Sequence, residues 1–222
     1  MDRAYSPRFT IARIVLPALI FASAFASAAR AEQNFGVGIH VGAHHNVGNL
    51  DSYDPAMQIK PQTSLLLGCS FKANLGFFFM RAGVDTTFVF SKGEVLEPSS
   101  NDTVTSYEIR YSQVPVFAGL SFPVQDVGEF YMGGGGAYLL ATGTVKHPAK
   151  EEISASAIGY GFLAGMQLTL TPNVRLYMEW EYIDARSAPV LATQPAPADQ
   201  WKNLYIDFTG HRILLGAMYY LI

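Results

Sequence analysis

Apolar and polar side chains alternate at every second position along several stretches of the chain. In residues 174–183, large apolar side chains occupy the even positions, and the odd positions carry Arg175, Tyr177, Glu179 and Glu181. The same period of two recurs in residues 35–44, 63–71, 77–90 and 158–170. A period of two is typical of β-strands, whose successive side chains point to opposite faces of a sheet. The pattern therefore predicts an all-β protein.

The spacing of these stretches predicts how the strands connect. We expect eight strands, at residues 34–47, 62–73, 77–90, 107–122, 129–145, 155–171, 174–186 and 203–222. Long and short connections alternate strictly, and the long ones, rich in Pro, Asp, Asn, Ser and Lys, are residues 48–61, 91–106, 146–154 and 187–202. An up-and-down membrane barrel whose two termini lie on the periplasmic side has this order of connections.

The composition of the two strand faces indicates which face points inward. One face is rich in Phe, Met and Leu, whereas the other carries Gly, small residues and a few charges. A membrane barrel turns the bulky face toward lipid and keeps small and charged residues in a narrow lumen. The sequence therefore predicts an eight-stranded antiparallel up-and-down transmembrane β-barrel. The alternative is a soluble, lipocalin-like barrel that buries the bulky face around an apolar ligand.

The first 31 residues have the features of a secretory signal peptide. Arg3, Arg8 and Arg13 precede or border an apolar stretch at residues 14–27, and small residues follow at Ala29-Arg30-Ala31. A basic start, a short apolar segment and small residues before the cut are the pattern that signal peptidase recognises. We therefore expect residues 1–31 to be cleaved off and residues 32–222 to form the barrel.

Composition excludes several other classes of protein. The chain of 222 residues is 50% hydrophobic and 15% charged, with a net charge of −3 and one cysteine. One cysteine rules out an internal disulfide and a cysteine-based zinc cluster. After residue 31 there is no run of 18 apolar residues, which rules out a polytopic helical membrane protein. The weak acidity gives no reason to expect nucleic acid as a partner.

Charged residues on the small-residue face are candidates for the interior of the barrel. They are Arg81, Asp85, Glu108, Arg110, Arg175, Glu179 and Glu181. The interior of an eight-stranded barrel is just wide enough for side chains to fill, and an unpaired buried ion is costly. We therefore expect these residues to form an ion-pair network that plugs the lumen. The alternative is the charged constriction of a narrow diffusion pore.

The sequence contains no motif that supports catalysis or metal binding. His40 and His44 lie four residues apart on one strand face, but nothing in the sequence fixes a third ligand. We therefore expect neither a metal site nor a cofactor, and we assign no catalytic residue. A Ser–His–acid triad is defined by geometry rather than by sequence position, so a lipid-modifying enzyme remains an alternative.

Four segments, in this order and spacing, resemble the small outer-membrane β-barrel family, namely the OmpA-like and OmpX-like transmembrane domains. They are Phe35–Gly42, Tyr111–Phe117, Phe130–Tyr138 and the closing Ile213–Ile222. The resemblance implies a bacterial outer-membrane location, with membrane lipid and lipopolysaccharide around the barrel and a last strand read by the barrel-insertion machinery. It also implies a non-enzymatic, structural or surface-interaction role, in which long extracellular loops contact a host or matrix ligand. Because the sequence ends at the last strand, we expect no peptidoglycan-binding domain.

Arg212 is a further candidate, for lipid rather than for the lumen. Counted along the last predicted strand, it falls on the lipid-facing positions ten residues before the end, which should place it near the outer leaflet. A lipid-facing arginine close to the membrane interface lowers the stability of the barrel only a little, and it can pair with lipopolysaccharide phosphates. We therefore expect a lipopolysaccharide contact at Arg212, unless a bulge near Gly210 turns the side chain inward.

Overall fold

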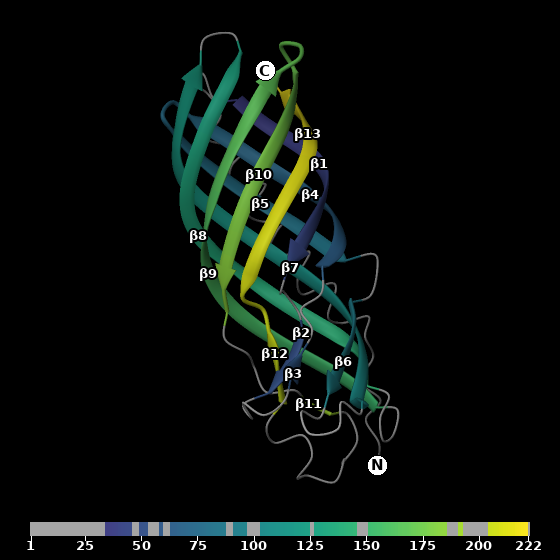
Figure 1. The fold of residues 1–222 in the computed structure, drawn as a ribbon. Coiled ribbons are helices and arrows are strands. Elements are labelled where there is room, and N and C mark those ends of the chain that lie inside the picture. Colours follow the sequence, from purple (N-terminus) through teal and green to yellow (C-terminus); the bar gives the residue numbers. More distant parts are fainter. Residues whose placement is uncertain are drawn as a thin grey trace, which may run out of the picture. The chain divides into compact units, whose positions relative to one another are not determined.

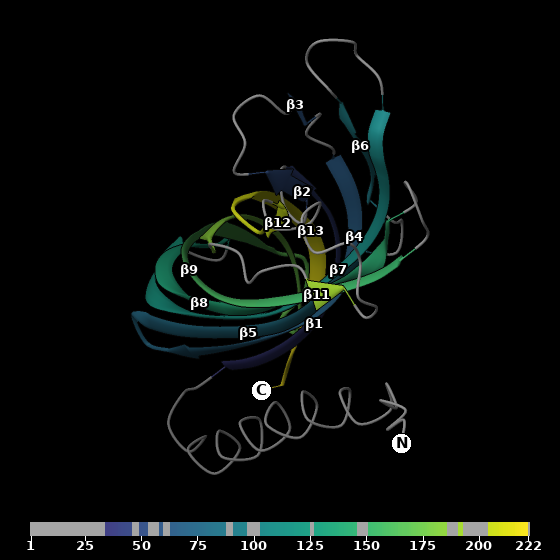
Figure 2. The same cartoon turned by 90° about the horizontal axis from the view of Figure 1, so that it is seen from below.

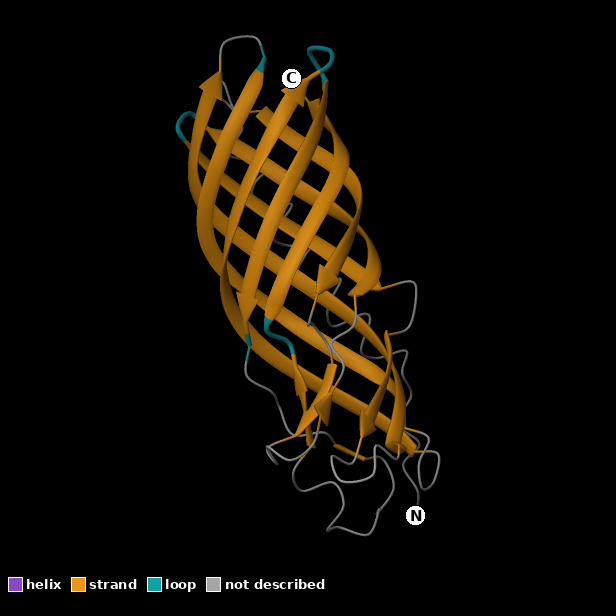
Figure 3. Ribbon diagram, viewed as in Figure 1, coloured by secondary structure: helices purple, strands orange, loops and turns teal. Residues whose placement is uncertain are grey.

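The computed structural model describes most of the chain from residue 34 to residue 221. The described residues are 34–45, 49–52, 58–59, 63–87, 91–96, 103–124, 127–145, 151–185, 191–192 and 204–221. Nearly all of them lie in β-strands joined by short turns, as Figure 3 shows. Among them, no helix is long and apolar enough to cross a membrane. The predicted signal peptide lies outside the described residues and stays a prediction.

Eight antiparallel strands close into one barrel (Figure 1, Figure 2). In order around the barrel they are β1 (Asn34–His45), β4 (Thr63–Leu75), β5 (Phe78–Thr87), β7 (Thr103–Val124), β8 (Gly128–Val145), β9 (Glu151–Thr169), β10 (Val174–Asp184) and β13 (Gly210–Leu221). Each strand pairs with the next, and β13 pairs with β1 along its whole length. The predicted eight-stranded antiparallel barrel is therefore confirmed.

The pairing register fixes the stagger of the strands. Starting at Gln113 on β7, the directly paired residues lead through β5, β4, β1, β13, β10, β9 and β8 and return to β7 at Pro123, ten residues farther along. Barrels with such a stagger have strands tilted by roughly 35–45° to the barrel axis. With eight strands, the inward-pointing side chains fill the lumen, so each of them has to pack against or bond to others.

The outward face of the barrel carries a belt of exposed apolar side chains. The exposed fraction is 83% for Ile158, 69% for Ile39 and 61% for Phe162. Other members of this outer belt are Leu65, Phe78, Val116, Met132, Tyr160, Leu168, Met178, Trp180, Ile213 and Leu215. Exposed side chains of this size are expected where lipid, not water, surrounds the protein. The soluble, lipocalin-like alternative is therefore wrong.

The outer belt ends at the same height on neighbouring strands. On β9, the outward positions change from Ile158 to Ser156 and Ser154, and on β8 the next outward positions beyond the belt are Thr142 and Thr144. The change occurs toward the end of the barrel that has the long connections. In outer-membrane barrels the long connections are extracellular and the short turns periplasmic, so this border marks the outer edge of the hydrocarbon layer.

Three strands continue beyond this border and build a larger sheet. β7, β8 and β9 have 22, 18 and 19 residues, whereas the other barrel strands have 10 to 13. β6 (Ser91–Leu96) pairs with β7, β3 (Gln58–Ile59) pairs with β6, and β11 (Leu191–Ala192) pairs with β9. The resulting order, β11-β9-β8-β7-β6-β3, defines what we call the extracellular sheet (Figure 1).

The short strands lie in stretches for which the sequence predicted only connections. Besides β3, β6 and β11, they include β2 (Asn49–Ser52), which pairs with β12 (Leu204–Asp207). Most have only two to four residues. A segment of that length shows no period of two, and β3, β6 and β11 become strands beside a longer neighbour whose backbone groups need hydrogen-bond partners. The expectation that these segments and β2 are only connections is thus wrong, whereas β12 falls inside the predicted strand at residues 203–222.

The inner face of the extracellular sheet is apolar, unlike the lumen below it. Its buried side chains form one cluster with two residues from β12 and the segment that follows it. The cluster includes Tyr107, Ile109, Leu139, Ala141, Ile153, Ile183, Ile206 and Phe208. The same cluster continues into the barrel through Phe117, Tyr131 and Phe79, so the inner face of the extracellular sheet packs on the outer part of a core that it shares with the barrel.

The height of the belt can be tested with two arginine substitutions on the same face of β9. We expect Phe162→Arg to lower the free energy of unfolding by about 2–4 kcal/mol, because it places a charge near the middle of the hydrocarbon layer. Ser154→Arg, beyond the border, should change it by less than about 1 kcal/mol. Urea unfolding in phospholipid vesicles measures both values. Equal losses for the two variants would contradict the border.

Candidate functional site

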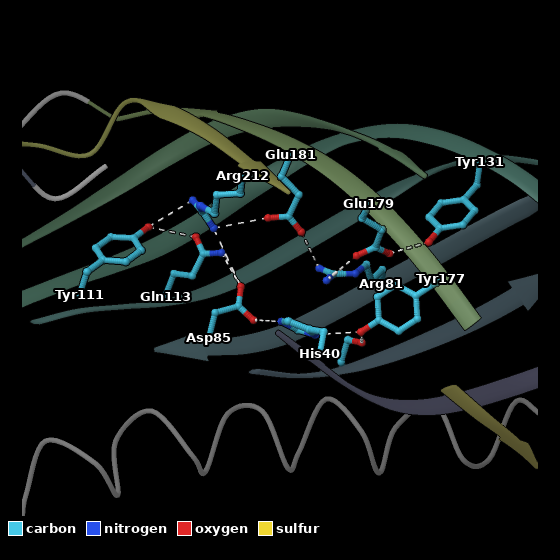
Figure 4. A network of polar contacts seen from close by, with 11 residues as sticks. His40, Arg81, Asp85, Tyr111, Gln113, Tyr131, Tyr177, Glu179, Glu181 and Arg212 are labelled. Atoms are coloured by element: carbon cyan, nitrogen blue, oxygen red, sulfur yellow. Dashed lines mark hydrogen bonds and ion pairs between the residues drawn. The ribbon is translucent and has the colours of Figure 1, made fainter. Parts of the chain in front are cut away.

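Arg81 lies at the centre of the lumen between two carboxylates from the opposite wall (Figure 4). Its Nη2 is 2.6 Å from Oε2 of Glu179, and its Nη1 is 2.9 Å from Oε1 of Glu181. Arg81 belongs to β5 and both glutamates belong to β10, which stands across the barrel. The exposed fraction of the Arg81 side chain is 0%. Because a buried ion is stable only when it is paired, this contact holds the two walls together.

A second arginine extends the ion pairs toward the extracellular end. Nη1 of Arg212, on β13, is 3.4 Å from Oε2 of Glu181 and 3.9 Å from Oδ2 of Asp85. Its Nη2 donates a hydrogen bond to the hydroxyl of Tyr111 at 3.2 Å. The Tyr111 hydroxyl in turn donates to Gln113, and the Gln113 amide donates to Asp85. The side chains of Arg212, Tyr111 and Gln113 are thus connected in a chain that ends at Asp85.

His40 connects this cluster to the wall formed by β1 and β4. Its Nε2 is 2.7 Å from Oδ1 of Asp85, and its Nδ1 is 2.8 Å from the hydroxyl of Tyr177. The Tyr177 hydroxyl also lies 3.0 Å from Oγ of Ser70. We call the connected set the central network. It comprises His40, Ser70, Arg81, Asp85, Tyr111, Gln113, Tyr131, Tyr177, Glu179, Glu181 and Arg212.

A separate group of polar side chains fills the periplasmic end of the lumen. Glu129 accepts hydrogen bonds from Lys72 at 2.6 Å, from Ser121 at 2.7 Å and from the Asn74 amide. Nη1 of Arg175 lies 3.5 Å from the same carboxylate. We call these five residues the basal cluster. Lys72 Nζ also lies 3.3 Å from the ring centre of Tyr131, whose hydroxyl donates to Glu179, so one aromatic ring joins the basal cluster to the central network.

Glycines make room for these side chains at two crowded points. A Cβ atom at Gly68 would collide with both His40 and Asp85, so the His40–Asp85 contact needs a residue without a side chain there. A Cβ at Gly165 would collide with the ring of Tyr131, which lies across that position to reach Glu179. Glycine in a strand often marks such a close approach. The small residues of the inward face are thus the space into which the large polar ones fit.

The central network contains four of the seven residues predicted for the lumen. Arg81, Asp85, Glu179 and Glu181 meet there, at the distances given above. Arg175 also points inward, but it lies in the basal cluster, nearer the periplasmic end of β10 than Glu179. The prediction of one continuous ion-pair network is therefore too simple.

Glu108 and Arg110 were predicted to point into the lumen, and this prediction is wrong. Both lie on the outward face of β7. In this strand the odd positions are buried, from Tyr107 to Phe117, so the even positions point out. The strand runs through Pro115 without a change of face. Both residues lie beyond the outer belt, on the extracellular sheet. The alternation misleads here because the inner face of that sheet is apolar and its outer face is polar.

Arg212 was predicted to point toward lipid, but it points into the lumen. It is buried in the central network, and the inward positions of β13 are Gly210, Arg212, Leu214, Met218 and Tyr220. The predicted lipopolysaccharide contact at Arg212 is therefore wrong. Apolar residues occupy both faces of this strand, as in Ile213-Leu214-Leu215, so the alternation alone does not identify the inner face.

Several lumen residues were not among the predicted set. Glu129 and Gln113 carry polar groups on inward positions of β8 and β7, and Tyr111, Tyr131 and Tyr177 supply hydroxyls. Glu129 and Tyr131 occupy successive odd positions of β8, so the alternation of this strand could have identified both as inward-facing. The tyrosines are harder to find, because an aromatic residue suits either face of a membrane barrel.

The lumen has little to offer a metal or a cofactor. Within the described ranges, no group of three or more His, Cys, Asp and Glu residues is arranged to hold a metal ion. The carboxylates of the central network are already bonded to guanidinium, imidazole or amide groups. The charged side chains of the lumen are therefore bonded mainly to one another, and these contacts hold the strands together.

Comparisons with known proteins agree with this geometry. Residues 14–220 match the family of outer membrane protein β-barrel domains. The chain belongs to this family. As an outer membrane β-barrel, it is a protein of the bacterial outer membrane, and the resemblance to small outer-membrane barrels is confirmed. No curated protein matches the sequence.

Several solved outer-membrane barrels share the fold. OprG from Pseudomonas aeruginosa matches with a TM-score of 0.62 and 11% identity, over 85% of this chain and 95% of OprG. A major outer membrane protein from Thermus thermophilus matches with a TM-score of 0.59 and 14% identity, over 86% of this chain and 100% of that protein. Neisserial surface protein A matches with a TM-score of 0.51 and 13% identity, over 83% of this chain and 95% of that protein. At such low identity these similarities establish the fold and nothing finer.

The two corrected arginines give a direct test of this outer membrane β-barrel. We expect Arg212→Met to lower the free energy of unfolding by about 3–5 kcal/mol, because it removes one of the two cations that are paired with the buried carboxylate of Glu181. Arg110→Met, on the outward face beyond the belt, should cost less than about 1 kcal/mol. Urea midpoints and slopes of refolded protein in detergent measure both. An unchanged free energy of unfolding for Arg212→Met would mean that Arg212 lies outside the lumen.

Proposed function

We propose that this outer membrane β-barrel is a non-enzymatic surface-interaction protein that presents the extracellular sheet to a partner outside the cell. The observation that carries the proposal is the contrast between the two ends of the molecule. The lumen contains bonded polar side chains, whereas three barrel strands project beyond the outer belt and carry a sheet whose inner face is packed with buried apolar residues.

The filled lumen argues against the narrow diffusion pore. A solute would have to pass the basal cluster, the rings of Phe79 and Tyr131, and then the central network. Side chains of Lys72, Arg81 and Arg212 are fully or almost fully buried, and their ion pairs cross the barrel. Opening a path for a solute means breaking buried ion pairs, and each unpaired buried charge costs several kcal/mol of free energy.

The same packing argues against a lipid-modifying enzyme. Asp85 and His40 form an acid–imidazole pair, but its far nitrogen meets the phenol of Tyr177 instead of a serine. All three side chains are buried, so a substrate does not reach them. A general base has to lie within hydrogen-bond reach of a bound substrate, and this one is bonded on both nitrogens inside the protein.

The extracellular sheet suits recognition because it is both exposed and held rigidly. Its outward face carries Glu108, Arg110, Thr142 and Glu152 on neighbouring strands, and its other face packs on the hydrophobic core. A polar surface on a fixed scaffold presents the same arrangement of groups to each encounter. Proteins use such surfaces for specific contact with other macromolecules.

Charge reversal on the sheet tests the proposal. Cells that express the protein should bind to at least one member of a panel of purified extracellular matrix proteins more than cells with an empty vector do. Glu108→Lys with Glu152→Lys should lower that binding by about fivefold or more, because two charges of the contact surface change sign. Val127→Lys, at the periplasmic end, is the control and should bind as the unchanged protein does.

Channel recordings on the same protein separate the proposal from its rival. Refolded protein in planar lipid bilayers should give no steady current steps. Current steps of constant size, together with binding no greater than that of empty-vector cells, would contradict the proposal and favour the diffusion pore. A heat-modifiability gel of each variant checks that the barrel is folded.

A further inference from the structure

Two histidines stand side by side where the first and the last strand of the barrel meet. The pairing register puts His45 of β1 directly opposite His211 of β13, close to the extracellular end of both strands (Figure 1). Both side chains are exposed on the outward face, whereas their chain neighbours His44 and Arg212 are buried in the lumen. Directly opposed residues of an antiparallel pair have Cβ atoms about 4.5–5.5 Å apart. Two imidazoles at this spacing are able to bind one metal ion together.

A hydroxyl group on β4 orients the ring of His45. Nδ1 of His45 lies 3.1 Å from Oγ1 of Thr63, on the strand that flanks β1 on the side away from β13. A neutral imidazole that donates its Nδ1 hydrogen to this hydroxyl keeps a lone pair on Nε2. The two nitrogens lie on opposite sides of the ring, so a bond from Nδ1 toward β4 turns Nε2 toward β13. Metal-binding histidines have such an oxygen partner on the second nitrogen, because it fixes the tautomer and the ring orientation.

Aromatic side chains of β10 hold the ring of His211. It stacks on the indole of Trp180, with ring centres 5.7 Å apart and an angle of 23° between the ring planes, and its centre is 5.0 Å from that of Tyr182. The stacking contact uses a face of the imidazole, whereas both nitrogens lie on the edge of the ring. Within the described part of the chain, no hydrogen bond reaches either nitrogen of His211. The edge of this ring is therefore accessible to a metal ion.

We propose that His45 and His211 form a binding site for one divalent transition-metal ion, which links β1 to β13 at the extracellular end of the barrel. The ion accepts a lone pair from one nitrogen of each ring, and water molecules fill its remaining positions. Among the described residues, no third His, Cys, Asp or Glu is arranged to complete the site. Imidazole suits copper and zinc, and copper(II) binds most tightly among the divalent first-row metals, so copper(II) is the ion that we expect.

The pair lies at the aqueous edge of the hydrocarbon layer. Ile213, the next outward residue of β13 toward the membrane, belongs to the outer belt, and the two histidines lie one row farther out. Asp184 follows at the next outward position of β10, where its carboxylate accepts hydrogen bonds from Tyr160 and Thr209. These bonds keep Asp184 from acting as a ligand, but its negative charge favours a cation close by.

A metal ion at this pair clamps the closure of the barrel. β1 and β13 are the first and the last strand of the barrel along the chain, and their pairing closes the ring. An ion bound by both strands stabilises the folded barrel over the unfolded chain, in which the two histidines are far apart. The sequence alone did not reveal the pair, because only the closure of the barrel brings positions 45 and 211 together.

Copper binding measured through Trp180 tests the site. The purified protein, without a histidine tag, carries Cys69→Ala and Trp201→Phe, so that it has no thiol and Trp180 is its only tryptophan. In detergent, Cu²⁺ should quench the fluorescence of Trp180 at one saturable site per barrel, and electron paramagnetic resonance should show two nitrogen ligands. Thr63→Val should weaken binding by about tenfold, because the orientation of His45 is lost. His45→Ala should weaken it further, since one ligand is removed.

A matched control and a second measurement complete the test. His147→Ala, which leaves the pair intact, should bind Cu²⁺ as the unchanged protein does. Zn²⁺ should raise the urea midpoint of the unchanged protein but not that of the double variant His45→Ala, His211→Ala. Equal copper affinity of His45→Ala and the unchanged protein, a spectrum with a single nitrogen ligand, or a midpoint that Zn²⁺ does not raise would each overturn the proposal. A gel shift on heating confirms that each variant is folded before titration.

Discussion

The pairing of buried charge is the constraint on which the rest of this barrel depends. Arg81 and Arg212 lie inside a lumen that side chains fill, and a buried ion without a partner would cost several kcal/mol. Their carboxylate partners come from β5 and β10, on opposite sides of the barrel. The contacts of Arg81 with Glu179 and Glu181 therefore link two walls that share no backbone hydrogen bonds, whereas Arg212 and Glu181 are direct neighbours on the paired strands β13 and β10.

This filled interior supports the proposal that the protein acts through its outer surface. The charged groups at the centre of the lumen are paired with one another. What remains accessible is the outer belt, which lipid covers, and the extracellular sheet with its polar face. Both surfaces meet at the border near Ile158 and Ser156, where the barrel passes from hydrocarbon to headgroups. The proposed partner binding uses the polar side of that border.

Sequence alternation predicted the strands well and the orientation of single residues only where the two faces differ. In β5 and β10 one face is apolar and the other charged, so Arg81 and Glu179 were placed correctly. In β13 both faces are apolar, which hid the inward position of Arg212. In the outer part of β7 the outward face is polar and the inward face is apolar, because water replaces lipid outside the membrane. Alternation therefore assigned Arg110 to the inward face, which is wrong. The depth of a residue, which alternation does not encode, decides these cases.

The central claim is that Arg81 and Glu179 are directly coupled inside the lumen. A double-mutant cycle with Arg81→Met and Glu179→Gln, measured by urea unfolding in phospholipid vesicles, tests it most directly. We predict a coupling free energy of about 2–3 kcal/mol, since each single variant leaves the other group buried without its partner. A coupling below about 0.5 kcal/mol, with both variants folded, would contradict the account, because it is the value expected for residues that do not touch.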